Sequence, residues 1–302
     1  MQVIRHLFIC YNMKTKNLFA SAISLASAFL FGCGPQSQTT ETQEIQSNAP
    51  ALTLLWETPA ELTTNESVLY DASSSIIFVS NIEGDPREKD GKGSISKINK
   101  SGEITEIDWV TGLNAPKGMG IIDGKLYVTD IDELLEIDMK DGSISNRFTV
   151  ENAKFLNDVD THGELVYFSD METGIIHVLE DGKIRVFAEN QKNINGLKIS
   201  KAGVVYGLDN EGLKKYDADG NFEMINSTVT GGDGLVILDD NTFIASRWKG
   251  EIYYIRDGKE TKILDTQSEE SNTADITYIE SDNLLLVPTF FKNKVSAYRL
   301  DY

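Results

Sequence analysis

KLYVTDIDELLEIDMKDG (residues 125–142) and LVYFSDMETGIIHVLEDG (165–182) decide the fold, because the second stretch repeats the pattern of the first. Each contains two short runs of β-type residues and ends on an Asp-Gly pair. Asp-Gly after such runs indicates a tight hairpin, since glycine tolerates a positive φ. Self-similarity at a fixed period is the signature of a repeat architecture. The two stretches therefore predict two copies of one structural unit.

The first run of this unit recurs along the whole chain. Its copies are IIFVSN (76–81), KLYVTD (125–130), LVYFSD (165–170), VVYGLD (204–209), TFIASR (242–247) and LLLVPT (284–289), with steps of 49, 40, 39, 38 and 42 residues between their starts. Another apolar stretch precedes each copy, so each repeat holds four strands over about 40 residues, the unit of a propeller blade. We predict an all-β chain folded as a six-bladed β-propeller of four-stranded blades. An eight-stranded sandwich or barrel is the alternative, and it fits the regular spacing poorly.

Two segments depart from the repeat. The long first step contains the polar stretch 83–92, which we expect to be an exposed loop within the first blade. The sixth repeat lacks its last strand, because the chain stops at Tyr302. ALTLLWET (51–58) resembles the fourth-strand segment ITEIDW (104–109), so we predict that it closes the ring as the outer strand of the last blade. Closure removes two unpaired sheet edges, and the propeller then covers residues 51–302.

The N-terminus has the pattern of an export signal, over residues 1–32. A short basic start precedes an apolar run from Leu18 to Gly32, which is shorter than the roughly 20 residues of a membrane-spanning helix. The run ends in Leu-Phe-Gly-Cys, which resembles a bacterial lipobox, so Cys33 is the expected lipidation site. The signal is complete from Met13, which we take as the true start.

Composition agrees with an exported protein. Residues 33–50 are polar after the cysteine and are expected to form a flexible tether. The only other cysteine, Cys10, lies in the leader, so we expect no disulfide in the propeller. These features predict an exported bacterial lipoprotein, periplasmic or at the cell surface, whose membrane contact is through the lipid alone.

The chain is strongly acidic. Its net charge is −19, from 28 Lys and Arg against 47 Asp and Glu residues. Such a charge disfavours binding to a nucleic-acid backbone or to an anionic membrane surface. We therefore expect a monomer that binds a small molecule and no nucleic acid.

The residues just before the first strand of each blade form a ring at one mouth of the central channel. Read from the repeat, the ring positions are Glu66, Lys117, Asn157, Asn195, Asp233 and Ala274. Four of them carry side-chain oxygens, and a hard divalent ion such as Ca²⁺ takes about six to eight oxygen ligands. Asp158 and Asp275 follow two of these positions and are expected to add to the site. No His or Cys lies in the ring, which argues against zinc or copper.

This pattern has two interpretations. The first is a divalent-cation site, most consistent with Ca²⁺, made by Glu66, Asn157, Asn195 and Asp233. The second is turn chemistry alone, because turns that lead into strands favour the same Asn-Gly and Asp-Gly pairs. Spacing does not decide between them.

A family resemblance favours the metal site. NESVLYDASSSIIFVSNI, FLNDVDTHGELVYFSD, NGLKISKAGVVYGLD and GDGLVILDDNTFIAS resemble blades of the regucalcin/gluconolactonase family of calcium-dependent lactonase propellers, which includes senescence marker protein and luciferin-regenerating enzyme. The likeness spans about residues 65–300 in short, dispersed motifs. It implies that Glu66, Asn195 and Asp233 bind the metal and that Asn157 serves metal or substrate.

The chain departs from the family pattern at a substrate-binding residue. Some members carry a substrate-binding Arg two positions before Asn157, where this chain has Phe155. The neighbouring Lys154 is the expected compensation. Lys117 is a cation beside the proposed cation site, so it would hold a substrate carboxylate or weaken metal binding. We therefore predict Asn157, Lys117 and Lys154 as substrate-binding residues.

Two functions follow as hypotheses. The first is a metal-dependent hydrolase of lactones or related esters at the channel mouth, in which the ion polarises the carbonyl and Asp233 or a metal-bound water acts as base. The second is a non-catalytic propeller lipoprotein that binds a small ligand or a protein partner. His162 is expected in a turn on the face away from the ring and His177 within a strand, so no Ser-His-Asp triad is expected.

Two other features recur near the same face. Asp130, Asp170 and Asp209 share one register and are expected to join neighbouring blades by hydrogen bonds. Trp248 follows the second strand of the fifth blade, so we expect it on a loop near the active face.

Overall fold

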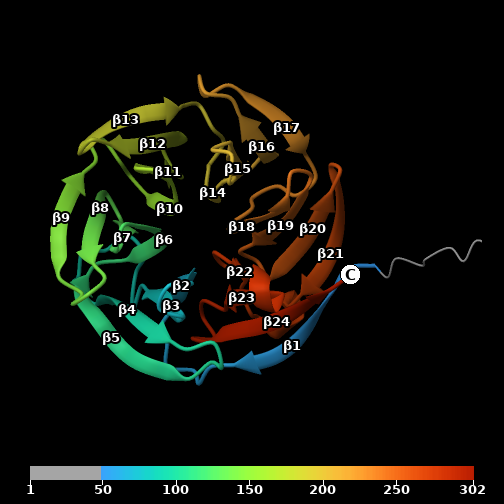
Figure 1. Ribbon diagram of the computed structural model, residues 1–302, viewed down its shortest axis with the longest axis horizontal. Helices are drawn as coiled ribbons and strands as arrows, with labels where there is room; N and C mark the ends of the chain where they lie inside the picture. Colours follow the sequence, from blue (N-terminus) through green and yellow to red (C-terminus); the bar gives the residue numbers. More distant parts are fainter. Residues whose placement is uncertain (1–48) are drawn as a thin grey trace, which may run out of the picture. The chain divides into compact units, whose positions relative to one another are not determined.

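The chain folds as a six-bladed β-propeller in the computed structural model, which describes residues 49–302 (Figure 1). The expected leader and Cys33 lie outside the described residues. Within that part, the only helical segments are two short 3₁₀ turns, Gln267–Glu269 and Glu280–Asp282. No helix in residues 49–302 is long and apolar enough to cross a membrane. The predicted fold class is confirmed, and the sandwich or barrel alternative is wrong.

Each blade is a four-stranded antiparallel sheet whose strands follow one another in sequence, except in the last blade. Blade one contains β2 (Asn65–Asp71), β3 (Ile76–Asn81), β4 (Gly93–Ile98) and β5 (Ile104–Leu113); blade two β6 (Pro116–Ile122), β7 (Lys125–Asp130), β8 (Glu133–Asp138) and β9 (Ile144–Thr149); blade three β10 (Leu156–His162), β11 (Leu165–Asp170), β12 (Ile175–Glu180) and β13 (Lys183–Ala188). Blade four contains β14 (Leu197–Ile199), β15 (Val205–Asp209), β16 (Gly212–Tyr216) and β17 (Phe222–Asn226); blade five β18 (Leu235–Asp239), β19 (Thr242–Arg247), β20 (Glu251–Arg256) and β21 (Lys259–Asp265); blade six β22 (Thr277–Ile279), β23 (Leu284–Pro288), β24 (Val295–Asp301) and β1 (Ala51–Glu57).

Burial follows the position of a strand in its blade. The second strands β3, β11 and β23 are buried along nearly their whole length, because a neighbouring blade packs on each face. Outer strands such as β9 and β13 are largely exposed along one side. The near-continuous apolar runs that mark the repeat are therefore the strands buried on both faces.

The hydrophobic core is divided among the blade interfaces. One cluster joins blades two and three, for example through Leu134 and Phe168. Another joins blades four and five through Leu208 and Phe243. A cluster of this kind lies at each of the six interfaces of the ring. Each blade thus buries its faces only against its neighbours, so the ring needs every blade.

The N-terminal strand closes the ring, as predicted. β1 pairs antiparallel with β24, from Ala51 opposite Asp301 to Glu57 opposite Ser296. Beyond the strand, the Thr58 Oγ1 accepts a hydrogen bond from the Val295 amide at 3.0 Å. Blade six is therefore assembled from both ends of the described chain.

The insertion in blade one lies over the channel mouth. Residues 83–92 connect β3 to β4 and are mostly exposed, as expected. Lys89 forms an ion pair with Asp132 of blade two, at 2.6 Å, and Arg87 forms one with Glu172 of blade three. These contacts hold the loop across blade two, a position that the sequence did not predict.

Three aspartates at the ends of second strands hold the connections that lead into their own blades. The Asp130 carboxylate accepts hydrogen bonds from the backbone amides of Asn114 (2.9 Å) and Ala115 (2.7 Å). Asp170 does the same for Lys154 and Phe155, and Asp209 for Lys192. They therefore bind the connections between blades, whereas the prediction was bonds to the neighbouring blade itself. Because these segments carry the ring residues, the aspartates also fix the channel mouth.

Candidate functional site

Five of the six predicted ring residues line one cavity at the channel mouth. The cavity has a volume of about 450 Å³, and its walls are the beginnings of the first strands, the loops before them and the loops after the second strands. Glu66, Lys117 and Asn157 lie within β2, β6 and β10, whereas the repeat predicted them just before these strands. It is lined by Glu66, Lys117, Asn157, Asn195 and Asp233. The sixth ring residue, Ala274, is fully buried behind it in a small cluster with Ile82 and Phe290. Residues up to 167 positions apart in sequence therefore meet in one pocket.

Hydroxyl groups of the preceding blade fix the backbone at three ring positions. Each hydroxyl belongs to the next-to-last residue of a second strand and donates to the carbonyl of the following ring residue. The bonds run from Thr129 Oγ1 to Asn157 O, from Ser169 Oγ to Asn195 O at 2.8 Å, and from Ser246 Oγ to Ala274 O at 2.7 Å. Sequence reasoning missed this role, although the Thr and Ser of YVTD, YFSD and FIASR recur in register.

The glycines after the ring residues serve close packing rather than turns. Gly118, Gly196 and Gly234 have no positive φ. A Cβ on Gly196 would lie 2.0 Å from the carbonyl oxygen of Asp233, and one on Gly234 would lie 2.3 Å from the Ile276 nitrogen. Glycine is required because the first strand of the next blade approaches the backbone directly. Turn chemistry therefore does not explain the Asn-Gly and Asp-Gly pairs.

The carboxylates of the ring are buried close to one another. Glu66 is 4% exposed and Asp233 is 3% exposed. Burial raises the pKa of both carboxyls well above the usual range, and the negative charge of Asp275 raises each further. Burial also raises the pKa of Asp275 to about 6. Like charges in a low-dielectric site disfavour joint ionisation, and a bound cation reverses this effect.

Asp158 and Asp275 lie beside the ring but do not line its cavity. The Asp158 carboxylate accepts hydrogen bonds from the backbone amides of Leu197 at 2.6 Å and Val159 at 2.8 Å. The Asp275 carboxylate accepts one from the Ser67 hydroxyl. Their oxygens are therefore engaged by neighbouring first strands, and they influence the ring through their charge.

Lys117 is a buried ammonium in the same cavity. Its side chain is 1% exposed, and its Nζ donates hydrogen bonds to the carbonyls of Ala115 (2.9 Å) and Pro86 (3.3 Å). Burial lowers the pKa of Lys117 to about 8, and the negative charge of Glu66 acts in the opposite direction. The lysine is therefore mostly protonated at neutral pH.

The donor set of the ring fits a hard cation. Glu66 Oε2 and Asn195 Oδ1 are buried and have no hydrogen-bond partner within residues 49–302. The Asn195 amide nitrogen donates to Asp233 Oδ1 at 3.2 Å, which leaves the amide oxygen free. Unsatisfied buried oxygens are costly, and a divalent cation would satisfy them.

The acidic groups alone do not make a metal site. In the described part of the chain, no group of three or more His, Cys, Asp or Glu side chains is placed to hold a metal ion. Glu66 and Asp233 are the two carboxylates of the predicted set, and the amides of Asn157 and Asn195 supply its other oxygens.

One of the three predicted substrate-binding residues, Lys154, does not line the cavity. Phe155 lines the cavity, whereas Lys154 is exposed and lies outside it. Arg87 of the blade-one insertion lines the wall instead, and its guanidinium lies 4.3 Å from the centre of the Phe155 ring. Trp248 lines the cavity as expected. Sequence reasoning missed Arg87 because an insertion has no counterpart in the other repeats.

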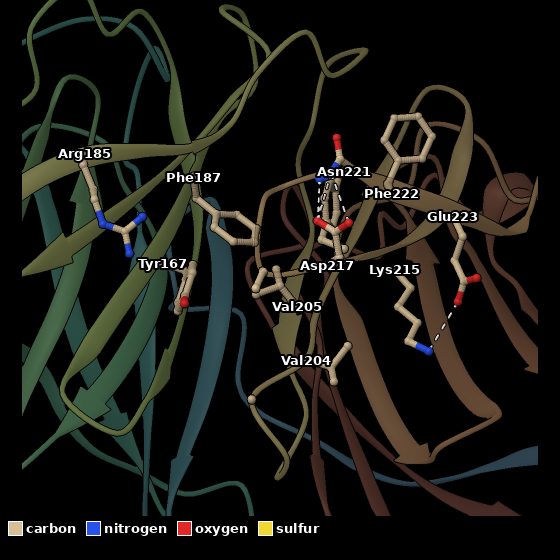
Figure 2. Close-up of a pocket in the computed structure, with 13 residues that line it drawn as sticks. Tyr167, Arg185, Phe187, Val204, Val205, Lys215, Asp217, Asn221, Phe222 and Glu223 are labelled. Atoms are coloured by element: carbon tan, nitrogen blue, oxygen red, sulfur yellow. Dashed lines mark hydrogen bonds and ion pairs between the residues drawn. The ribbon is translucent and has the colours of Figure 1, made fainter.

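A second cavity lies elsewhere, in the groove between blades three and four (Figure 2). It measures about 780 Å³. Its aromatic side chains pack on one another, with Tyr167 and Phe187 at 5.3 Å between ring centres. Lys215 pairs with Glu223, and Asn221 donates to Asp217. Arg185 pairs with Glu180, which lies outside the groove. These charged groups already have partners, whereas the ring cavity contains buried oxygens without one among residues 49–302, so the ring cavity is the better candidate site.

Comparison with known proteins finds likeness in structure only. No protein-family model and no curated protein matches the sequence. Regucalcin from Agrobacterium tumefaciens, a calcium-binding protein, superposes with a TM-score of 0.60 at 18% identity, covering 82% of this chain and 94% of its own. A gluconolactonase from Xanthomonas campestris gives 0.60 at 12% identity, covering 84% and 91%. Virginiamycin B lyase from Staphylococcus aureus gives 0.59 at 12%, covering 83% and 99%.

The TM-scores show a shared fold, and the low identities show nothing beyond it. The structural neighbours include gluconolactonases, regucalcin and luciferin-regenerating enzyme, which are the proteins that the blade motifs resemble. They also include a lyase, so the fold carries more than one chemistry. The activity of this chain must therefore be argued from its own site.

Proposed function

We propose that the ring cavity is the active site of a metal-dependent hydrolase of lactones or related esters. One observation carries the proposal: two carboxylates and two amides line one buried cavity in which Glu66 Oε2 and Asn195 Oδ1 have no partner in the described chain. The gluconolactonase and regucalcin neighbours support it. Ca²⁺ is the proposed cation, because every donor is oxygen.

Glu66, Asn157, Asn195 and Asp233 would hold the cation. When bound, it would act as a Lewis acid toward the carbonyl of the substrate. Asp233, a buried carboxylate in the cavity wall, takes a proton from the attacking water as general base. Asn157 orients the substrate carbonyl through its amide. The water oxygen bonds to the carbonyl carbon and the ring C–O bond breaks. Asp233 returns the proton to the leaving alkoxide oxygen, and a hydroxy acid leaves.

Lactone hydrolysis tests this proposal. The full chain is freed of metal with a chelator and assayed with γ- and δ-lactones before and after Ca²⁺ is added. We expect hydrolysis only with the cation. If the chain binds such compounds but hydrolyses none at any Ca²⁺ concentration, it is a binding propeller. The replacement of the family's Arg by Phe155 favours that second function.

We also propose that the chain is a lipoprotein anchored at Cys33 and exported to the periplasm or cell surface. The apolar run ending in Leu-Phe-Gly-Cys supports this. Wild type is expected in the membrane fraction with an acyl mass on Cys33, and Cys33→Ser in the soluble fraction. Equal membrane fractionation of the two, without an acyl mass on the wild type, would contradict the anchor.

A further inference from the structure

The wall of the cavity formed by blades one to three is cationic. Lys117 Nζ has two carbonyl acceptors, and an ammonium has three N–H donors. No carboxylate of the described chain lies within ion-pairing distance of it. A buried charge without a counter-ion is costly. If Glu66 serves a cation, Lys117 needs an anion from outside the protein.

Arg87 extends this wall. Its guanidinium and the Lys117 ammonium both lie over the Phe155 ring, at 4.3 and 4.5 Å from its centre. The ring quadrupole favours both cations. Glu172 holds Arg87 at the cavity by an ion pair, and the Pro86 carbonyl binds Lys117. Two cations from different blades are thereby fixed around one aromatic ring.

The opposite wall is aromatic. Trp248, from blade five, packs edge-on against Phe290 at 5.4 Å and against Phe291 at 5.8 Å between ring centres. Blade five stands across the ring from blade two, which carries Lys117 (Figure 1). Trp248 lines the cavity and is 38% exposed, whereas Phe291 supports it from outside the cavity. Exposed aromatics that border a cavity are typical of a ligand-binding surface.

Backbone strain fixes this aromatic wall. Phe290 has a φ of 49°, in the left-handed region that large side chains rarely adopt. Such strain clusters at ligand clamps, where the surrounding structure holds it. Here the strained turn places the Phe290 ring against Trp248 at the cavity.

We propose that the cavity binds an amphipathic acid: a lactone or ester with an aromatic or aliphatic body and a separate carboxylate, with the body on Trp248 and Phe290 and the carboxylate between Lys117 and Arg87. The lactone part of this inference rests on the proposed function. A polyhydroxylated sugar lactone would leave hydroxyl groups against the aromatic wall, which offers few hydrogen-bond partners.

A comparison of neutral and anionic lactone substrates tests the proposal. The full chain with Ca²⁺ is assayed with γ-phenyl-γ-butyrolactone, with its para-carboxylate derivative, and with glucono-δ-lactone. We expect a kcat/KM at least about tenfold higher for the carboxylate derivative than for the neutral lactone, the value of one hydrogen bond to a charged group. Lys117→Met and Arg87→Met should each reduce this preference. Lys140→Met, which removes an exposed charge from blade two outside the cavity, should keep it.

Binding separates this proposal from the hydrolase proposal. Calorimetry with 4-propylbenzoate and 4-propylbenzamide, neither of which contains a lactone, measures the same preference without turnover. If no lactone is hydrolysed but the benzoate binds at least about tenfold tighter and loses this in Lys117→Met, the amphipathic-acid site stands and the hydrolase fails. If neutral and anionic lactones react equally, or the two benzoyl compounds bind equally or not at all, the amphipathic-acid site is wrong.

Discussion

Asp233→Asn should lower the kcat/KM for a lactone substrate by about 10²–10⁴, the usual contribution of a general base. The substitution removes both the proposed base and one charged ligand, so the calcium-dependent rise in melting temperature should also disappear. Without metal, the variant should melt at or above the wild-type temperature, because one of several mutually repelling buried carboxylates is gone. Steady-state kinetics and calorimetric melting measure these effects.

Asp240→Asn is the matched control. It makes the same charge change in the same blade, but Asp240 is exposed and follows β18 at the end away from the cavity. It should retain wild-type kinetics and the calcium-dependent shift. An Asp233→Asn variant that keeps the wild-type kcat/KM would remove Asp233 from the mechanism, and equal losses in both variants would make the effect one of overall charge.

Deleting residues 34–58 should unfold the propeller, whereas deleting residues 34–48 should leave its melting temperature nearly unchanged. The longer deletion removes β1, which pairs along β24, and with it the packing of Leu52 and Trp56 on two core clusters. Several hydrogen bonds at about 1 kcal/mol each, together with the apolar contacts of these two partly buried side chains, amount to a large share of the stability of a typical domain.

Melting followed by circular dichroism compares the two truncations. Both keep Cys33, so their comparison isolates the strand. Equal melting temperatures would mean that β1 adds nothing to closure and that blade six is stable with three strands.

The sequence predicts the fold well because one physical unit repeats. A second strand buried on both faces, with an Asp-Gly or similar turn after the third strand, recurs about every 40 residues. The strands β7 (KLYVTD), β11 (LVYFSD) and β19 (TFIASR) begin and end at the predicted residues. The same register placed Glu66, Asn157, Asn195 and Asp233 at one mouth, where the structure brings them into one cavity.

The repeat could not predict the positions of side chains that belong to no repeated position. Arg87 comes from an insertion that only blade one contains, and its position depends on the ion pair with Glu172 of blade three. Lys154 was predicted from its place next to Phe155, but it lies in a bend before β10, whose local geometry the repeat does not predict. Phe155 lines the cavity, and Lys154 is exposed.

A calorimetric calcium titration tests the central claim, that the ring side chains form one divalent-cation site. The full chain, freed of metal, should bind one Ca²⁺ with saturable heat, and Ca²⁺ at one hundred times its Kd should stabilise the fold by about 2.7 kcal/mol. Glu66→Gln should weaken the binding, because it removes a charged ligand whose Oε2 has no other partner in the described chain. A wild-type chain that shows neither calcium-dependent heat nor any rise in melting temperature would contradict the account.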